Sequence, residues 1–155
     1  MAVVGIPHPS PRWSRSLEPG PHATAEGRWF LWESLADRAS PDQVQLAALL
    51  TTEILSIVAR QGRDLSGGIS VIASVVEGRL FVLVREQGLG FSVGQQMGAR
   101  TDVWGMMLVA KLSSRWGVER LTTGTYIWFE LEDPSKGHGK ERGPGMAPGP
   151  PDAGH

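Results

Sequence analysis

Apolar residues recur at intervals of three and four in the stretch AEGRWFLWESLADRA, which predicts a helix from about Ala25 to Arg38. Its wide apolar face is formed by Trp29, Phe30, Trp32 and Leu35. A large apolar face on a helix has to be buried, so we expect the two tryptophans to pack against a sheet or against a second subunit.

The following stretch, DQVQLAALLTTEILSIVARQG, keeps the helical spacing over a longer distance. Ser40 stands at a capping position in front of it and Pro41 at the first helical site. Gly62 follows the last apolar residues and is typical of a helix end. We therefore expect a long, mostly buried helix between these two signals.

Two later stretches are rich in β-branched or alternating apolar residues, which predicts two hairpins. In GGISVIASVVEGRLFVLVREQ the turn falls at Glu77-Gly78, and in GVERLTTGTYIWFELE it falls near Thr123-Gly124. The stretch WGMMLVAKLSSRW between the hairpins returns to helical spacing, and RWSRSL fits a short additional strand before the first helix.

The resulting order is helix, helix, strand, strand, loop, helix, strand, strand, which indicates an α+β fold. The economical arrangement is a two-layer sandwich, with about three helices covering one face of a mainly antiparallel mixed sheet. A chain of 155 residues with 41% hydrophobic content can bury one core, so we expect one domain over residues 12–132. The Pro- and Gly-rich ends, residues 1–11 and 133–155, are expected to be disordered tails.

Composition excludes several classes of site and partner. The chain has no cysteine, which rules out disulfides, thiolate zinc sites and cysteine nucleophiles. A net charge of -1 gives no bulk electrostatic reason to expect binding to nucleic acid or to an anionic membrane. No apolar run approaches the roughly 20 residues of a membrane span, and the N-terminal residues lack the pattern of a signal peptide. We expect a soluble, cytoplasmic protein.

A long stretch without apolar period, Gly90–Val103, separates the first hairpin from the third helix. A loop of this length inside a compact domain is usually functional or disordered. It is therefore the first place to look for a bound ligand.

Four short motifs stand around this loop in a fixed order: TTEILSIVARQ in the second helix, REQGLG at the end of a strand, VWGMML at the start of the third helix, and SSRWGVERLTTGTYIWFEL at the last hairpin. In this order the chain resembles the ATP-binding domain shared by histidine kinases and gyrase, the GHKL or Bergerat-type fold. It resembles most closely the stand-alone regulators related to anti-sigma factor serine kinases. The resemblance extends from about Trp13 to Glu132.

The resemblance implies a catalytic role for Glu53, as the general base that orients or deprotonates an attacking group. Four residues further along the same helical face, relatives carry an asparagine whose oxygen holds magnesium. This chain has Ile57 there, and isoleucine offers no oxygen ligand to Mg²⁺. The usual protein anchor for the metal is therefore missing.

At the adenine end, the resemblance implies that Glu86 accepts a hydrogen bond from the adenine amino group, in place of the usual aspartate. Gly88 and Gly90 match the two glycines that permit a tight turn and close approach of the base. Thr125 matches a threonine that assists the adenine contact, directly or through water. A strand threonine also has a purely structural interpretation, because β-branched residues are common in strands.

At the phosphate end, the resemblance assigns Gly105 to a helix start whose backbone N–H groups approach anionic oxygens. The second glycine of this motif is replaced by Val103, whose branched side chain would leave less room for phosphate oxygens beside the backbone N–H groups. Arg100 in the lid could supply a charged contact to phosphate, although a solvated loop arginine is an equal alternative.

Two functional hypotheses follow. In the first, the chain is an ATP-binding regulator resembling an anti-sigma factor serine/threonine kinase, with a sigma factor or an anti-anti-sigma factor as partner; homodimers are common among such regulators. In the second, it is a degenerate GHKL pseudo-ATPase that acts as a protein-binding module without catalysis. An unrelated α+β domain would leave Glu53 and Glu86 facing different surfaces.

Overall fold

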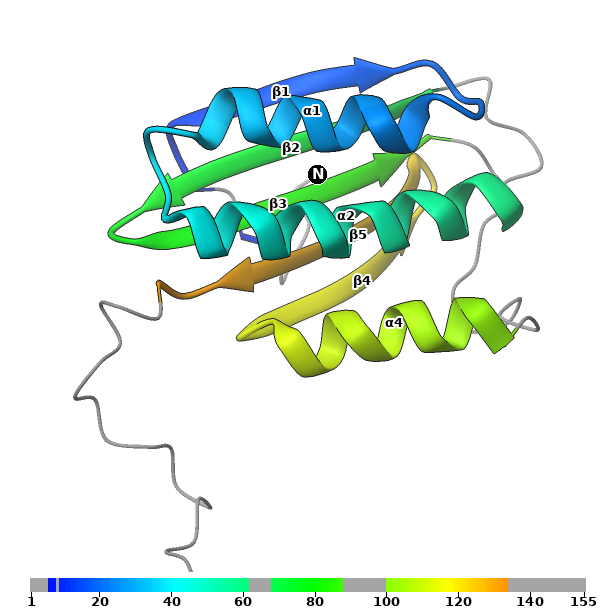
Figure 1. Ribbon diagram of the computed structural model, residues 1–155. Helices are drawn as coiled ribbons and strands as arrows, with labels where there is room; N and C mark the ends of the chain where they lie inside the picture. Colours follow the sequence, from blue (N-terminus) through cyan, green and yellow to red (C-terminus); the bar gives the residue numbers. More distant parts are fainter. Residues whose placement is uncertain (1–5, 8, 62–67, 88–99, 134–155) are drawn as a thin grey trace, which may run out of the picture.

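The computed structural model describes residues 6–7, 9–61, 68–87 and 100–133, which form helices on one face of a sheet (Figure 1). The elements, in chain order, are β1 (Arg12–Leu17), α1 (Ala23–Leu35), α2 (Pro41–Gln61), β2 (Ile69–Val76), β3 (Arg79–Glu86), α4 (Arg100–Leu112), β4 (Arg115–Leu121) and β5 (Gly124–Leu131). This order is the one predicted from the sequence, including the short strand at RWSRSL.

The five strands form one sheet in the order β1-β2-β3-β5-β4, and each pair of neighbours is antiparallel. Helices α1, α2 and α4 lie side by side on the same face of this sheet (Figure 1). The predicted α+β two-layer sandwich is therefore confirmed. The antiparallel pairing brings the end of β3, at Glu86, beside the start of β5, at Thr125, although the two are far apart in sequence.

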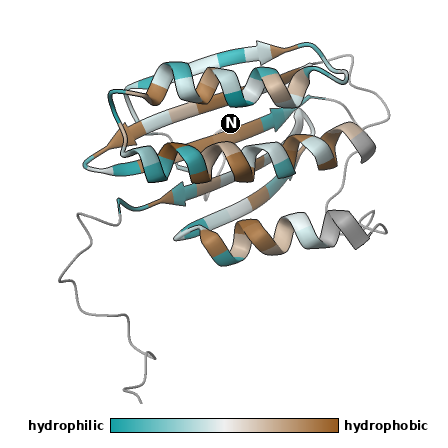
Figure 2. Cartoon of the chain, in the orientation of Figure 1, coloured by the Kyte–Doolittle hydropathy of each residue, from teal (hydrophilic) through white to brown (hydrophobic). Residues whose placement is uncertain are grey.

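Helix α2 is the centre of the core. It packs against α1, α4 and β3, and hydrophobic residues recur along it and along the strands behind it (Figure 2). Its segment Pro41–Ala59 is long and apolar enough for a membrane span, contrary to the expectation that no such run exists. However, 56% of its most apolar window is buried inside the protein, as expected for the core helix of a globular domain. Its fully buried side chains include Val44, Ala47, Leu50, Ile54, Ile57 and Val58.

The start of α2 is fixed by a capping box. The Gln43 backbone N–H donates to the Ser40 hydroxyl at 3.1 Å, and the Ser40 N–H donates to the Gln43 side-chain oxygen at 3.0 Å. The Gln43 side-chain amide also donates to the carbonyl of Gly78 at 2.8 Å and to that of Leu131 at 3.3 Å. One buried glutamine thus joins the helix start to the first hairpin and to the end of β5.

Helix α1 begins two residues before the expected position and ends at Leu35, three residues earlier than expected. Its buried face contains Phe30, Leu31 and Leu35, but Trp29 is 62% exposed and Trp32 is 41% exposed. The expected burial of both tryptophans against the sheet is therefore wrong, and the alternative, packing against a second subunit, stays a prediction. Helical spacing identified an apolar face, but the sheet contacts only its Phe30–Leu31 side.

The turns of the two hairpins fix the strand register. Glu77 and Gly78 have φ angles of 51° and 81°, as a two-residue hairpin turn with two left-handed positions requires. The second hairpin turns at residues 122–123, immediately before Gly124. Arg120 accordingly lies inside β4 and is part of the sheet.

The far face of the sheet carries a smaller apolar cluster. Ile6, from the segment expected to be a tail, is 5% exposed and packs with Phe81, Leu83 and Trp128. The Ser74 hydroxyl donates to the Pro11 carbonyl at 2.6 Å nearby. The expected disorder of residues 1–11 therefore does not extend to Ile6.

We predict that Gln43→Ala destabilises the protein by about 2–4 kcal/mol, because it removes the side-chain half of the capping box and leaves the carbonyls of Gly78 and Leu131 without this donor. Urea unfolding measures the change. Gln45→Ala, on the exposed side of the same turn, is the matched control and is expected to stay within about 0.5 kcal/mol. Equal effects of the two substitutions would contradict this role for Gln43.

Candidate functional site

Glu86 and Thr125 lie directly opposite each other in the pairing of β3 with β5. Alternation along the strands places Glu86 on the same face as Val84, and Thr125 on the same face as Ile127. Both of these apolar neighbours belong to the core cluster under the helices. The Glu86 carboxylate, 1% exposed, and Thr125, 3% exposed, are therefore adjacent on the helix side of the sheet.

Gly124 allows this close pairing. Its φ angle is 140°, and a Cβ atom there would collide with the backbone carbonyl oxygen of Glu86 and lie 2.9 Å from the Gln87 Cα. Only glycine combines such a backbone angle with the absence of a side chain. The Gly-Thr pair in the sequence thus places Thr125 beside Glu86.

A second contact joins α2 to α4. A Cβ atom on the buried Gly105 would lie 3.0 Å from a carboxylate oxygen of Glu53 and 3.4 Å from the Cδ1 atom of Ile57. The absence of a side chain at Gly105 lets the two helices approach at this point. The structure therefore brings together three of the positions that the motifs singled out.

Gly105 does not stand at the start of its helix. Helix α4 begins at Arg100, so Gly105 lies in its second turn. The backbone N–H groups that remain free at a helix start belong to its first four residues. In this structure Gly105 serves close helix packing, and its expected contact with phosphate stays a prediction.

Ile57 stands at the position where the resemblance implies a metal-binding asparagine. It is 0% exposed and belongs to the same core cluster as Val84 and Ile127. The side chain at position 57 is therefore a buried hydrocarbon group. It cannot serve Mg²⁺, because Mg²⁺ requires several oxygen ligands in near-octahedral geometry. Among the described residues, no group of three or more His, Asp or Glu side chains could hold a metal ion. The residues at this position do not fit a protein-bound magnesium.

Arg120 was not among the site residues that the sequence predicted. It lies directly opposite Thr125 in the pairing of β4 with β5, so its side chain leaves the same face of the sheet. Glu86, Thr125 and Arg120 form a row across three adjacent strands. The row follows from two strand registers, that of β3 with β5 and that of β4 with β5, and the second is set by the turn at residues 122–123.

The remaining predicted contacts lie outside the described residues. Gly88 and Gly90 fall in the gap between β3 and α4, together with most of the expected lid. Arg100 is described as the first residue of α4, but its side chain and that of Val103 are not. Their roles stay predictions.

The Trp-Gly motif has a structural explanation. Gly117 pairs with Trp128, and a Cβ atom on Gly117 would lie 2.6 Å from the indole nitrogen. The indole therefore lies over the bare backbone of Gly117, on the far face of the sheet. This motif supports the scaffold and lies on the side of the sheet opposite to Glu86.

No protein-family model matches the sequence, and no curated protein sequence is significantly similar to it. Solved structures do match the fold. The RsbU and RsbW domains of Rv1364c from Mycobacterium tuberculosis align with a TM-score of 0.62 and 19% identity, over 80% of this chain and 33% of that chain. The histidine kinase domain of the blue-light activated histidine kinase from Erythrobacter litoralis EL346 aligns with a TM-score of 0.51 and 18% identity, over 72% and 60% respectively.

These similarities confirm the expected fold, because the chain shares it with the matching region of the RsbU–RsbW protein and with the histidine kinase domain. The chain spans 33% and 60% of the length of the two matching chains. At these levels of identity the comparison supports the fold and leaves the activity to be argued from the site.

We predict that Gly124→Ala destabilises the protein by more than about 3 kcal/mol, because the new Cβ atom meets the Glu86 carbonyl in addition to the strained backbone angle. Gly20→Ala is the matched control, because Gly20 has a similar φ of 151° but no atom within 4 Å of the added Cβ. Chemical denaturation compares the two. A similar loss of stability in both variants would contradict the proposed contact.

Proposed function

We propose that this chain is a regulatory binding domain of the GHKL fold that recognises an adenine base but does not carry out magnesium-dependent phosphoryl transfer. The observation that carries the proposal is the complete burial of Ile57 against Gly105. The proposal corresponds to the degenerate, non-catalytic alternative suggested by the motifs.

The adenine end supports base recognition. The Glu86 carboxylate can accept a hydrogen bond from an exocyclic amino group, and the neighbouring Thr125 hydroxyl can donate or accept one, directly or through water. Both side chains lie on the helix side of the sheet, where a ligand would be enclosed between the two layers. A polar pair at the edge of an apolar core is typical of a site that fixes the orientation of a flat ligand.

The phosphate end supports the loss of transfer chemistry. When bound in a kinase, magnesium neutralises the charge on the transferring phosphate group. Ile57 supplies no oxygen for magnesium, and its side chain is 0% exposed, so no water molecule contacts this position. We therefore derive no phosphoryl transfer step for this chain.

An active ATP-dependent serine/threonine kinase is the second candidate, and Glu53 favours it. Its carboxylate is only partly buried and lies beside Gly105, where it could accept a proton from a partner's hydroxyl group. Both candidates require a regulatory protein partner. A sigma factor or an anti-anti-sigma factor in the cytoplasm, with or without formation of a homodimer, is the partner that the resemblance suggests.

ATP titration monitored by tryptophan fluorescence tests the proposal, because the exposed Trp104 is adjacent to Gly105. We predict that excess Mg²⁺ changes the ATP affinity by no more than about twofold relative to EDTA. We also predict that Glu86→Leu weakens ATP binding at least about tenfold, because the amino group of the bound adenine loses its hydrogen-bond acceptor. Arg85→Leu is the control, since Arg85 lies on the opposite face over Tyr126. Tightening by Mg²⁺ of more than about tenfold would favour the kinase.

Substitution of Ile57 tests the burial directly. We predict that Ile57→Asn destabilises the protein by about 3–5 kcal/mol, because it places an amide in the apolar core. The conservative control Ile57→Val is expected to cost about 0.5–1.5 kcal/mol. If Ile57→Asn instead keeps the stability of the parent protein and gains Mg²⁺-dependent ATP affinity, position 57 faces an open nucleotide site.

A further inference from the structure

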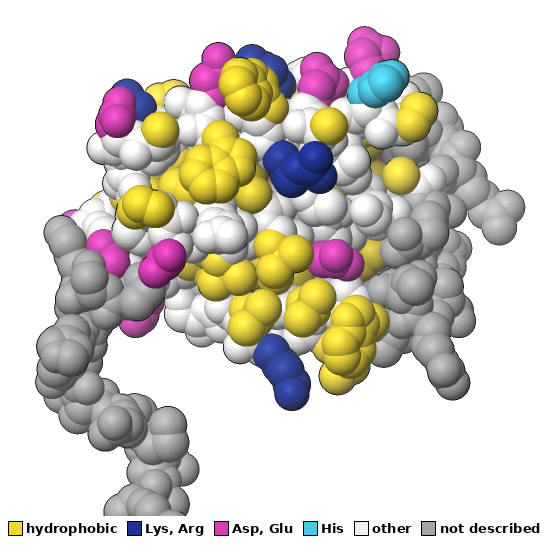
Figure 3. All heavy atoms as spheres, in the orientation of Figure 1, with side chains coloured by type: hydrophobic (Ala, Val, Ile, Leu, Met, Phe, Trp, Pro, Cys, Tyr) yellow, Lys and Arg dark blue, Asp and Glu magenta, His cyan; other side chains and the backbone are white. Residues whose placement is uncertain are grey.

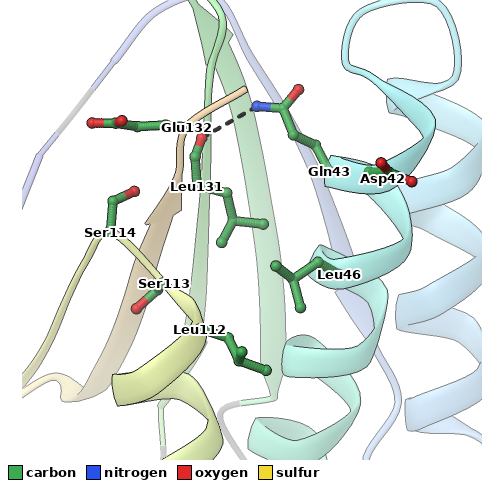
Figure 4. A pocket seen from close by; sticks show the side chains of 8 residues that line it. All are labelled: Asp42, Gln43, Leu46, Leu112, Ser113, Ser114, Leu131 and Glu132. Atoms are coloured by element: carbon green, nitrogen blue, oxygen red, sulfur yellow. Dashed lines mark hydrogen bonds between the residues drawn. The ribbon is translucent and has the colours of Figure 1, made fainter. Parts of the chain in front are cut away.

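A cavity of about 330 Å³ opens between the start of α2 and the end of α4 (Figure 4). Leu46, Leu112 and Leu131 point into it from three different elements, α2, α4 and β5 (Figure 4). None of the predicted nucleotide-site residues lines it. Its complete lining consists of Asp42, Gln43, Leu46, Leu112, Ser113, Ser114, Leu131 and Glu132.

A second hollow of about 430 Å³ continues from the first along α2. It is lined by Asp42, Gln45, Leu46 and Leu49, and it shares Asp42 and Leu46 with the first cavity. Together the two form a surface that we call the α2–α4 groove. From Asp42 to Leu49 it follows about two turns of helix, or roughly 11 Å.

The walls of the α2–α4 groove leave large apolar side chains in contact with water. Leu49 is 44% exposed and Leu112 is 43% exposed. Figure 3 shows hydrophobic side chains gathered over α2 and α4 on this face. Contiguous exposed apolar surface of this kind is typical of an interaction site.

The charge of the groove is one-sided. Among the described residues that line it, Asp42 and Glu132 are the charged ones, and both are acidic. Glu132 is bridged to Arg79 at 3.3 Å, but both side chains are 51% exposed, so solvent screens this pair. Lys111 is exposed on α4 beside Leu112 but does not line the groove. An occupant that is apolar and carries positive charge where it meets Asp42 and Glu132 complements this surface.

We propose that the α2–α4 groove binds a short amphipathic helix of a partner protein, with leucine-type residues at helical spacing and Lys or Arg at the end that lies at the start of α2. Such a helix places its apolar residues against Leu46, Leu49 and Leu112, and its cationic end beside Asp42 and Glu132, which both line the first cavity. The inference rests on the proposed role of the chain as a binding module and names the chemistry of its partner.

Charge also argues against a second copy of this chain as the occupant. In a two-fold symmetric contact the same patch meets itself, so the interface would hold the acidic residues of both grooves and, among the described lining residues, no cation. Like charges at such an interface oppose association. A partner of opposite charge has no such cost.

Fluorescence anisotropy with labelled 14-residue peptides tests the inference on the full chain. The basic probe has leucines at helical spacing and lysines at its ends, and the acidic probe has glutamates in place of the lysines. We predict that the chain binds the basic probe at least about tenfold more tightly than the acidic one. Leu49→Gln combined with Leu112→Gln should weaken binding of the basic probe at least about tenfold.

Two further variants separate specific docking from general attraction. Asp42→Asn with Glu132→Gln should abolish the preference between the probes and leave the apolar contact in place. Trp29→Gln, on the exposed face of α1 outside the groove, should change neither affinity. Circular dichroism establishes that each variant is folded.

Three outcomes would overturn the inference. The first is equal affinity for both probes, and the second is undiminished binding of the basic probe by the double glutamine variant. The third is a concentration-dependent dimer of the parent chain that the double glutamine variant does not form. That result would assign the groove to a second copy of the chain. Glu86→Leu should bind the basic probe like the parent chain. Failure of the proposed nucleotide binding and failure of the proposed peptide binding in the groove can therefore be distinguished.

Discussion

The packing of α2 between the sheet and its two neighbouring helices is the constraint on which the other features depend. Its apolar side chains run from Val44 to Val58 and meet the helix-facing residues of β3 and β5. Gln43 fixes the start of the helix by bonds to carbonyls 35 and 88 residues away in sequence. Because one helix is held so firmly, the positions that face α4 and the sheet are fixed as well.

This packing decides the chemistry of the site. Ile57 extends the core to the point where a metal ligand would stand, and Gly105 brings α4 down onto it. At the edge of the sheet the register of β3 with β5 keeps a carboxylate and a hydroxyl together at Glu86 and Thr125. Under the proposed function, Glu86 and Thr125 would hold the base, and the buried Ile57 offers no oxygen to a metal. The proposed partner surface, the α2–α4 groove, lies near the start of α2.

Local signals predicted most of the fold. Glu77-Gly78 gave the first hairpin because few dipeptides adopt two left-handed angles, and Ser40-Pro41 gave the start of α2. Long-range features were out of reach. The exposure of Trp29 depends on where the sheet ends, and the row of Glu86, Thr125 and Arg120 depends on register. The motifs named Glu53, Glu86, Gly105 and Thr125, but only the structure shows that Gly105 lies inside α4 and that Ile57 is buried.

The central claim is that this chain recognises an adenine base and gains nothing from metal-bound phosphates. Calorimetric titration of AMP and of Mg²⁺-ATP into the same protein tests it most directly. The account predicts dissociation constants that agree within about threefold, because the contacts at Glu86 and Thr125 are common to both ligands. Binding of Mg²⁺-ATP that is about a hundredfold tighter than that of AMP would contradict it, because it would require a functional metal and phosphate site around Ile57 and α4.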